Sequence, residues 1–124
     1  MNLVDSCGWL EYFANGANAD FFAPAVEDVR NGIVPSICLL EVFKKILQRK
    51  DEDSALQAVA LMLQGRIVDL NPFLSVHAAR IGYELNLPLA DSVILATARM
   101  HNAVIWTQDV HFKNIQGVKY RAKK

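Results

Sequence analysis

Short apolar runs recur along the chain, and each is followed by one or two longer stretches with helical periodicity. Runs of four or five residues rich in Val, Ile and Leu are typical of strands that are buried on both faces. We therefore predict four strands and a further short edge strand, at residues 2–5, 33–36, 66–70, 103–107 and 118–120.

The stretches between these runs predict helices. Residues 6–13 open with Ser6, which can cap a helix, and residues 19–30 end at an Asn-Gly pair. Further helices are predicted at residues 36–50, 51–65, 72–86 and 91–102. This alternation predicts an α/β fold, a three-layer α/β/α domain around a parallel sheet of about four to five strands. Since no linker, repeat or low-complexity segment interrupts the pattern, we expect residues 1–124 to form a single domain.

Composition agrees with a single folded core. The 124 residues are 52% hydrophobic, which is ample for one domain. The sequence has neither a leader of secretory type nor an uncharged run long enough for a membrane span, so we expect a cytoplasmic protein. Its two cysteines, Cys7 and Cys38, lie outside any CxxC or Cys/His cluster, which favours buried free thiols over a disulfide or a zinc site.

The net charge is zero, with 13 basic and 13 acidic residues, so no global basic field indicates nucleic-acid binding. The basic residues are nevertheless clustered in "KKILQRK" at residues 44–50 and in the segment after Asp109, which contains no acid. A charge run of this kind indicates either a solvated face or a contact surface for phosphates.

Several carboxylates follow predicted strands. Asp5 ends the first strand, Asp69 lies near the end of the third, and Asp109 follows the fourth by two residues. In open parallel sheets, ligands bind beyond the carboxyl ends of the strands, so this edge is the candidate site. Asp91 begins a predicted helix, where an aspartate most often acts as an N-cap, although the same position can also direct a carboxylate into a cleft.

Glu41 lies within the apolar sequence "ICLLEVF". A helical wheel places it on a polar face that it shares with Lys45 and Gln48. The apolar arc on the opposite side consists of Leu39, Leu40, Val42, Phe43, Ile46 and Leu47. Spacing alone therefore favours a solvated glutamate paired with Lys45 at i,i+4.

Convergence of Asp5, Glu41, Asp91 and Asp109 would give the chain a definite chemistry. Four carboxylates in one pocket repel one another unless a cation neutralises them. Oxygen ligands without Cys or His suit Mg²⁺ or Mn²⁺. Such a site activates water for attack on a phosphodiester, and neighbouring lysines would hold the nucleic-acid backbone.

The order of these motifs resembles the PIN-domain family, and specifically the VapC toxins of bacterial type II toxin–antitoxin pairs. The similar segments are "LVDSCGW" with Asp5, "PSICLLEVFKKI" with Glu41, and "LNLPLADSVILATARMHNAVIWTQDVHFKNI" with Asp91, Thr107 and Asp109. Together they extend over essentially the whole chain, so the resemblance rests on a series of motifs rather than on one aspartate.

The resemblance implies a PIN-like fold and a Mg²⁺-dependent endoribonuclease, with Mn²⁺ able to substitute. Asp5, Glu41, Asp91 and Asp109 would be catalytic. Of these, Asp5, Asp91 and Asp109 would bind the metal ion. Ser6 and Thr107 would orient carboxylates or phosphate, and the RNA would contact Lys44, Lys45 and Lys113. A homodimer is also implied, as is an antitoxin that inserts a segment near the active site.

One position departs from the resemblance. Some family members carry a further acid two residues after the fourth one, where this chain has His111. An exposed loop histidine is the simpler interpretation, and a contribution to the site stays open. His77 and His101 have no partner at metal-ligand spacing and are expected to be structural.

Three other functions are compatible with parts of the pattern. A receiver-type signalling domain has a similar sheet and an acidic pocket, but it needs adjacent acids after the first strand, and here Ser6 follows Asp5. A PIN-fold scaffold without catalysis would not need all four acids. A PIN nuclease of RNA processing or quality control, acting without an antitoxin, would need all four acids and stays an alternative.

Overall fold

Five short parallel strands form one sheet in the computed structural model, which describes all 124 residues. The strands run in the order β3-β2-β1-β4-β5, so β1 is central. Their bounds are Asn2–Val4 for β1, Gly32–Pro35 for β2, Arg66–Val68 for β3, Val104–Thr107 for β4 and Val118–Tyr120 for β5. The predicted α/β class is confirmed, and the predicted edge strand is β5.

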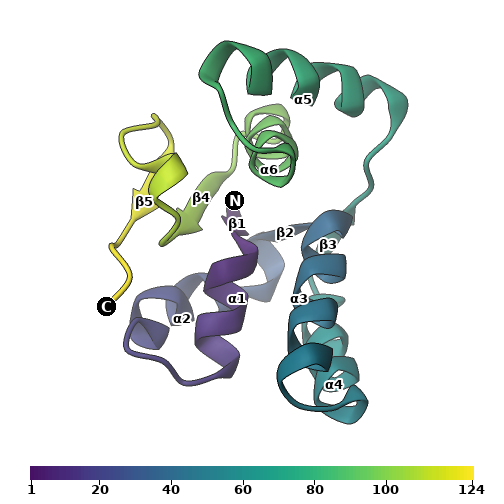
Figure 1. The fold of residues 1–124 in the computed structure, drawn as a ribbon, viewed down its shortest axis with the longest axis vertical. Helices are drawn as coiled ribbons and strands as arrows, with labels where there is room; N and C mark the ends of the chain where they lie inside the picture. The colour runs from purple at the N-terminus through teal and green to yellow at the C-terminus, as the bar shows by residue number, and fades with distance from the viewer.

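Six helices cover the two faces of the sheet. They are α1 (Ser6–Phe13), α2 (Ala19–Glu27), α3 (Ser36–Arg49), α4 (Glu52–Met62), α5 (Pro72–Leu85) and α6 (Leu89–Met100). Figure 1 shows α5 and α6 above the strands and α1 to α4 below them. The chain moves in one direction across the sheet from β1 through β2 to β3, and then in the opposite direction to β4. Because each crossover is right-handed, the helices that connect strands in the two directions lie on opposite faces.

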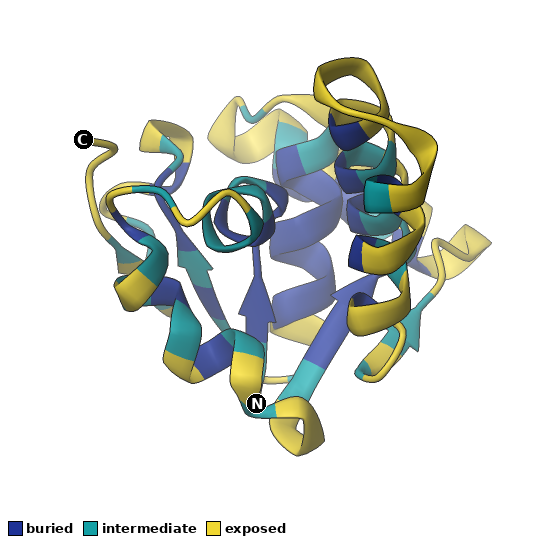
Figure 2. Cartoon of the chain, turned by 90° about the horizontal axis from the view of Figure 1, so that it is seen from below, coloured by how far each residue is buried: buried dark blue, intermediate teal, exposed yellow.

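The core lies between the sheet and these helices. Buried apolar side chains form one continuous cluster that includes Leu3, Ile33 and Ile105 of the three central strands, and they make up the dark-blue centre of Figure 2. In α6 every residue from Asp91 to Ala98 is buried. The reason is that α6 is covered by the sheet on one side and by α5 on the other.

Three helices have a boundary that differs from the predicted one by two residues or more. The helix predicted at 19–30 ends at Glu27 and is followed by a separate 3₁₀ turn, Val29–Asn31, because Asp28 leaves the helical conformation with φ −86° and ψ 71°. The helix predicted at 51–65 spans 52–62, and the helix predicted at 91–102 begins two residues earlier, at Leu89. That last difference changes the position of Asp91 within its helix.

The two cysteines are unpaired, as the sequence predicted. Cys7 and Cys38 are free thiols, the first half-buried and the second fully buried. Among the helices, none combines the length and the apolar character that crossing a membrane requires.

The ends of β1 and β4 determine where the site lies. The two strands pair in parallel, with Val4 opposite Trp106. The next residues, Asp5 and Thr107, therefore lie at the same edge of the sheet, and the amide of Asp5 donates a 3.0 Å hydrogen bond to the carbonyl of Trp106.

Candidate active site

Asp5 lies at the junction of the central strand and the first helix. It is the N-cap of α1, and its Oδ1 accepts a 2.7 Å hydrogen bond from the amide of Ser6. The prediction that Ser6 caps this helix is therefore wrong. The capping function falls to the last extended residue, which leaves the Ser6 hydroxyl free for another contact. Asp5 is only 4% exposed.

Thr107 connects Asp5 to the segment that carries Asp109. Its hydroxyl donates a 2.7 Å hydrogen bond to Asp5 Oδ2 and accepts one of 2.9 Å from the amide of Asp109. The Cys7 thiol lies 3.4 Å from the same Asp5 oxygen, so this free thiol, predicted only as a buried residue, borders the carboxylate. Both Asp5 oxygens are thus already engaged by the protein.

Asp91 reaches the same edge from the opposite face of the sheet. It lies in the first turn of α6, whose N-cap residue is Pro88, so the N-cap role predicted for Asp91 is wrong. The side chain, in a residue that is 7% exposed, instead pairs with His111, whose Nδ1 lies 2.9 Å from Asp91 Oδ2.

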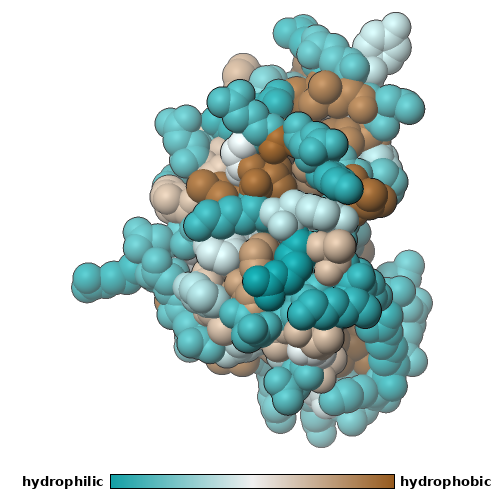
Figure 3. All heavy atoms as spheres, turned by 90° about the vertical axis from the view of Figure 1, so that its left-hand side faces the viewer, coloured by the Kyte–Doolittle hydropathy of each residue, from teal (hydrophilic) through white to brown (hydrophobic).

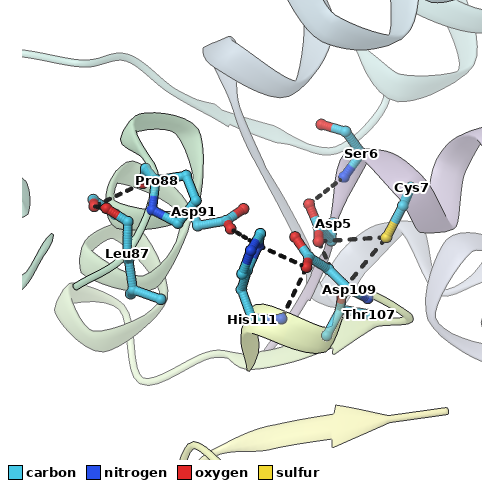
Figure 4. A network of polar contacts seen from close by, with 10 residues as sticks. Asp5, Ser6, Cys7, Leu87, Pro88, Asp91, Thr107, Asp109 and His111 are labelled. Carbon is cyan, nitrogen blue, oxygen red and sulfur yellow. Dashed lines mark hydrogen bonds and ion pairs between the residues drawn. The ribbon is translucent and has the colours of Figure 1, made fainter. Parts of the chain in front are cut away.

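His111 contacts two aspartates at once. Its Nδ1 also lies 3.0 Å from Asp109 Oδ1, and its backbone amide donates a 2.9 Å hydrogen bond to that same oxygen. Figure 4 shows the imidazole between the two carboxylates. The side chain is 51% exposed, as expected of a loop histidine, yet it belongs to the site. Its position two residues after Asp109 was the only sequence signal for this role.

The carboxylates at this edge perturb one another. Burial raises the pKa of Asp5 to about 6, against the hydrogen bonds from Thr107 and Cys7, and the charge of Asp109 adds to the rise. Burial also raises the pKa of Asp91 to about 7, assisted by the charges of Asp109 and Asp5. The pKa of His111 is raised, chiefly by the charge of Asp109. Negative charge is concentrated at this edge of the sheet, and a cation would relieve it.

Glu41 approaches the site through Ser6. The Ser6 hydroxyl donates a 2.7 Å hydrogen bond to Glu41 Oε1, and Glu41 makes no ion pair with Lys45. The predicted solvated pair is therefore wrong. The buried face of α3 consists of Cys38, Val42 and Ile46, whereas Leu40 and Leu47 of the predicted apolar arc are exposed. Glu41 consequently borders the buried face rather than lying opposite to it.

The other charged and histidine candidates lie outside this cluster. Lys44, Lys45 and Lys113 are exposed, and so is Asp69 at the end of β3. His77 and His101 are half-buried and do not belong to the group of side chains close enough to share an ion.

One group of donors fits a divalent cation. Ligand atoms of Asp91, Asp109 and His111 all lie within 4.8 Å of one another. Two carboxylates and one imidazole are donors that divalent ions accept in proteins. Asp5, predicted as a leading ligand, is not in this group, and its oxygens accept hydrogen bonds from Ser6 and Thr107. It contributes its charge from beside the group.

Comparisons with known proteins agree with this fold. The sequence model of the PIN domain matches residues 3–118. A toxin–antitoxin complex from Klebsiella pneumoniae contains a chain of similar structure, with a TM-score of 0.80, 22% identity and 96% coverage of each chain. VapC20 of Mycobacterium tuberculosis, described as a sarcin–ricin loop cleaving toxin, has a TM-score of 0.80 at 17% identity, over 98% of this chain and 99% of that one. No curated protein sequence matches significantly.

A third similar structure is VapBC2 from Rickettsia felis bound to a DNA fragment from its promoter, with a TM-score of 0.73, 15% identity and coverage of 98% and 97%. At these identities the structural likeness establishes the fold, and the family match covers nearly the whole sequence. The chain belongs to the PIN domain family. Membership excludes the receiver-type signalling domain.

Proposed function

We propose that this chain is a metal-dependent endoribonuclease and the toxin of a toxin–antitoxin pair. The observation that carries the proposal is the convergence of Asp5, Asp91 and Asp109 at one edge of the sheet, where the charge of Asp109 helps to raise the pKa of both Asp5 and Asp91. Membership of the PIN family supports nuclease activity, and the similar fold of a toxin that cleaves the sarcin–ricin loop supports RNA as substrate. Such a toxin acts in the cytoplasm, where its RNA is.

Asp91 and Asp109 would hold Mg²⁺ or Mn²⁺, and the charge of Asp5 would favour the ion from beside them. Such an ion, when bound, supplies a Lewis acid that activates water and stabilises negative charge on a phosphodiester. Thr107 keeps Asp5 and the Asp109 backbone in register, and Ser6 holds Glu41 beside Asp5. Glu41 thereby adds a fourth carboxylate at the border of the site, where it can contact substrate or solvent.

Exposed lysines provide the contacts for the RNA backbone. Lys44 and Lys45 follow Glu41 on α3, and Lys113 follows His111 by two residues. None of the three is engaged in an ion pair within the chain. Their ammonium groups are therefore free to bind phosphates on either side of the acidic cluster.

The experiment is cleavage of a structured RNA pool with Mg²⁺ or Mn²⁺, comparing the wild type with Asp5→Asn and Asp91→Asn. We expect the wild type to cleave the RNA and a chelator to abolish this cleavage. Each variant should cleave at least about 100-fold more slowly, because each removes a charge that the ion requires. The exposed Asp69→Asn is the matched control and should cut like the wild type. Equal cleavage by all four proteins would refute the assigned site.

The antitoxin would dock in an apolar groove between α1, α3 and α4. This groove has a volume of about 240 Å³ and is lined by Leu10, Phe13, Ile46 and Leu61, with Arg49 and Lys50 among its lining residues. An apolar segment that also carries acidic side chains is complementary to such a surface. The antitoxin is the occupant we assign, because two of the similar structures are toxin–antitoxin assemblies.

A small reading frame next to the gene would encode this partner. Leu61→Glu should weaken its complex with the chain, whereas Leu63→Glu should not, because Leu63 is equally exposed but does not line the groove. Calorimetric titration of the purified partner would measure the difference. A gene without such a neighbour would favour a PIN nuclease of RNA processing instead.

A homodimer would form through the outer surface of α5. Phe73, Val76 and Tyr83 of this helix are 74%, 63% and 90% exposed, and Leu89 at the start of α6 is 81% exposed. Brown, apolar side chains gather in the upper half of Figure 3, where Figure 1 places α5 and α6. Large apolar side chains exposed together are typical of a protein–protein interface.

A further inference from the structure

His111 is held firmly against both aspartates by its own segment. Asp109 is the N-cap of the 3₁₀ turn Val110–Phe112 and accepts the amide of His111. At the end of the same turn, Phe112 is fully buried in the core. The imidazole therefore projects from a turn that is fixed at both ends. Its contact with Asp91 and Asp109 follows from the backbone as well as from charge attraction.

The imidazole nitrogen lies at the spacing of ligands that share one ion from each of the two carboxylates, whose own ligand atoms are within 4.8 Å of each other. Nδ1 lies 2.9 Å from Asp91 Oδ2 and 3.0 Å from Asp109 Oδ1. Adjacent ligands around an octahedral ion with bonds of about 2.1 Å are about 3.0 Å apart. The distances from Nδ1 to the two carboxylates are therefore already those between neighbouring ligands of one ion, and the turn need not move.

A nitrogen donor changes which ion the site prefers. Mg²⁺ strongly favours oxygen ligands, whereas imidazole suits transition-metal ions. From this geometry we propose that His111 is a metal ligand through Nδ1, together with Asp91 and Asp109, and that the site binds Mn²⁺ in preference to Mg²⁺. The inference rests on the proposed metal-dependent nuclease. Because a histidine ligates only as neutral imidazole, loading the ion releases the Nδ1 proton to solvent.

The test measures binding of the metals alone to the full chain, without RNA. Wild type, His111→Ala and His111→Asp are titrated with MnCl₂ and with MgCl₂ by calorimetry. We expect the wild type to bind Mn²⁺ at least about 10-fold more tightly than Mg²⁺, and His111→Ala to lose Mn²⁺ affinity by about 10–100-fold while Mg²⁺ affinity changes much less. His111→Asp, which restores an oxygen donor, should shift the preference toward Mg²⁺.

Pulsed EPR of the Mn²⁺-loaded protein supplies a readout that a merely structural histidine would not produce. Coupling of the Mn²⁺ spin to an imidazole nitrogen is expected in the wild type and should be absent in His111→Ala. His101→Ala is the matched control, because His101 lies at the far end of α6, about 15 Å along the helix from Asp91, and should leave coupling and affinities unchanged.

The outcomes separate this inference from the proposed function. Suppose that the wild type binds Mn²⁺ and cuts RNA. The inference alone is then overturned if the wild type has no nitrogen coupling, or if His111→Ala has the same Mn²⁺/Mg²⁺ affinity ratio as the wild type. A wild type that binds neither ion and cuts no RNA overturns both. Because the His111 side chain is half exposed, its replacement leaves the core intact, and circular dichroism of each variant checks this directly.

Discussion

The Thr107 hydroxyl lies 2.7 Å from Asp5 Oδ2 and joins two residues that are 102 positions apart in the sequence. The Thr107 hydroxyl oxygen also accepts a hydrogen bond from the amide of Asp109, so one buried hydroxyl holds two of the acidic residues in a fixed relation. The pairing of β1 with β4 therefore brings the acidic residues together, and the Thr107 side chain links them by its hydrogen bonds to Asp5 and Asp109.

Replacing this hydroxyl should disturb both stability and metal binding. Thr107→Val leaves the Asp109 amide without its partner and leaves Asp5 Oδ2 with only the weak thiol donor of Cys7, so we expect the free energy of unfolding to fall by about 1–3 kcal/mol. Mn²⁺ affinity should fall by about 10–100-fold. Urea denaturation and metal titration measure the two effects. Thr97→Val is the control, since Thr97 is equally buried but its hydroxyl bonds only to the Val93 carbonyl. Equal metal binding by both variants would contradict this role.

The contact between Ser6 and Glu41 predicts coupled effects on catalysis. If Ser6 positions Glu41, Ser6→Ala and Glu41→Gln should each reduce the single-turnover cleavage rate by about 10–100-fold. The double variant should lose little more than either single one, because both changes remove the same contact. Glu52→Gln, an exposed acid on α4, serves as the unaffected control. Fully additive losses would show that the two residues act independently.

The raised acid pKa values predict how the metal-free protein responds to pH. Asp5 and Asp91 bind protons more tightly when folded than when unfolded, with pKa values of about 6 and about 7. This contribution to stability is fully present below the unfolded pKa near 4 and is lost as pH rises through 6 to 7. We expect Tm in EDTA to be on the order of 5 °C higher at pH 5.5 than at pH 8.

Two controls isolate the carboxylates in this pH experiment. Asp91→Asn should flatten the dependence and raise Tm at pH 8, because it removes the repelled charge. Saturating Mn²⁺ should raise the wild-type Tm more at pH 8 than at pH 5.5, since protons compete with the ion. A wild-type Tm that rises from pH 5.5 to pH 8 in EDTA would be the opposite of what this site requires.

Close packing of α5 on α6 predicts the effect of a change outside the site. A Cβ at Gly82 would overlap the hydroxyl of Ser92, the neighbour of Asp91. Gly82→Ala should therefore lower the free energy of unfolding by about 1–3 kcal/mol, although alanine favours helix by about 1 kcal/mol. Adding Ser92→Ala should restore part of the loss. Gly32→Ala, with no neighbouring atom nearer than 3.5 Å, should be nearly neutral, and a Gly82→Ala variant as stable as this control would argue against the overlap.

The exposed apolar side chains of α5 predict the oligomeric state. If Phe73 lies in a dimer interface, Phe73→Glu should convert the protein to a monomer at micromolar concentration, as measured by light scattering after gel filtration. Leu56→Glu places the same charge on α4, where Leu56 is 52% exposed, and should leave the dimer intact. A wild type that is already monomeric would exclude the interface.

The alternation of apolar runs and helical stretches was enough to predict the parallel sheet, because periodicity is a local property of the backbone. The same pattern placed Asp5 at the end of the first strand and Asp109 just beyond the fourth. The parallel pairing of β1 with β4 brings these two strand ends to one edge of the sheet. Helix ends were predicted less accurately, since Asp28 and Pro88 decide them through backbone conformations that a periodic pattern does not encode.

Tertiary structure alone decided how side chains from different segments meet. The wheel of α3 directed Glu41 toward solvent, but α1 packs beside α3 and brings the Ser6 hydroxyl to it. His111 looked like a loop residue because its partners, Asp91 and Asp109, come from a helix above the sheet and from the end of a strand. Such contacts depend on the order of the strands and on the packing of helices across them, which no local pattern of hydrophobic and polar residues contains.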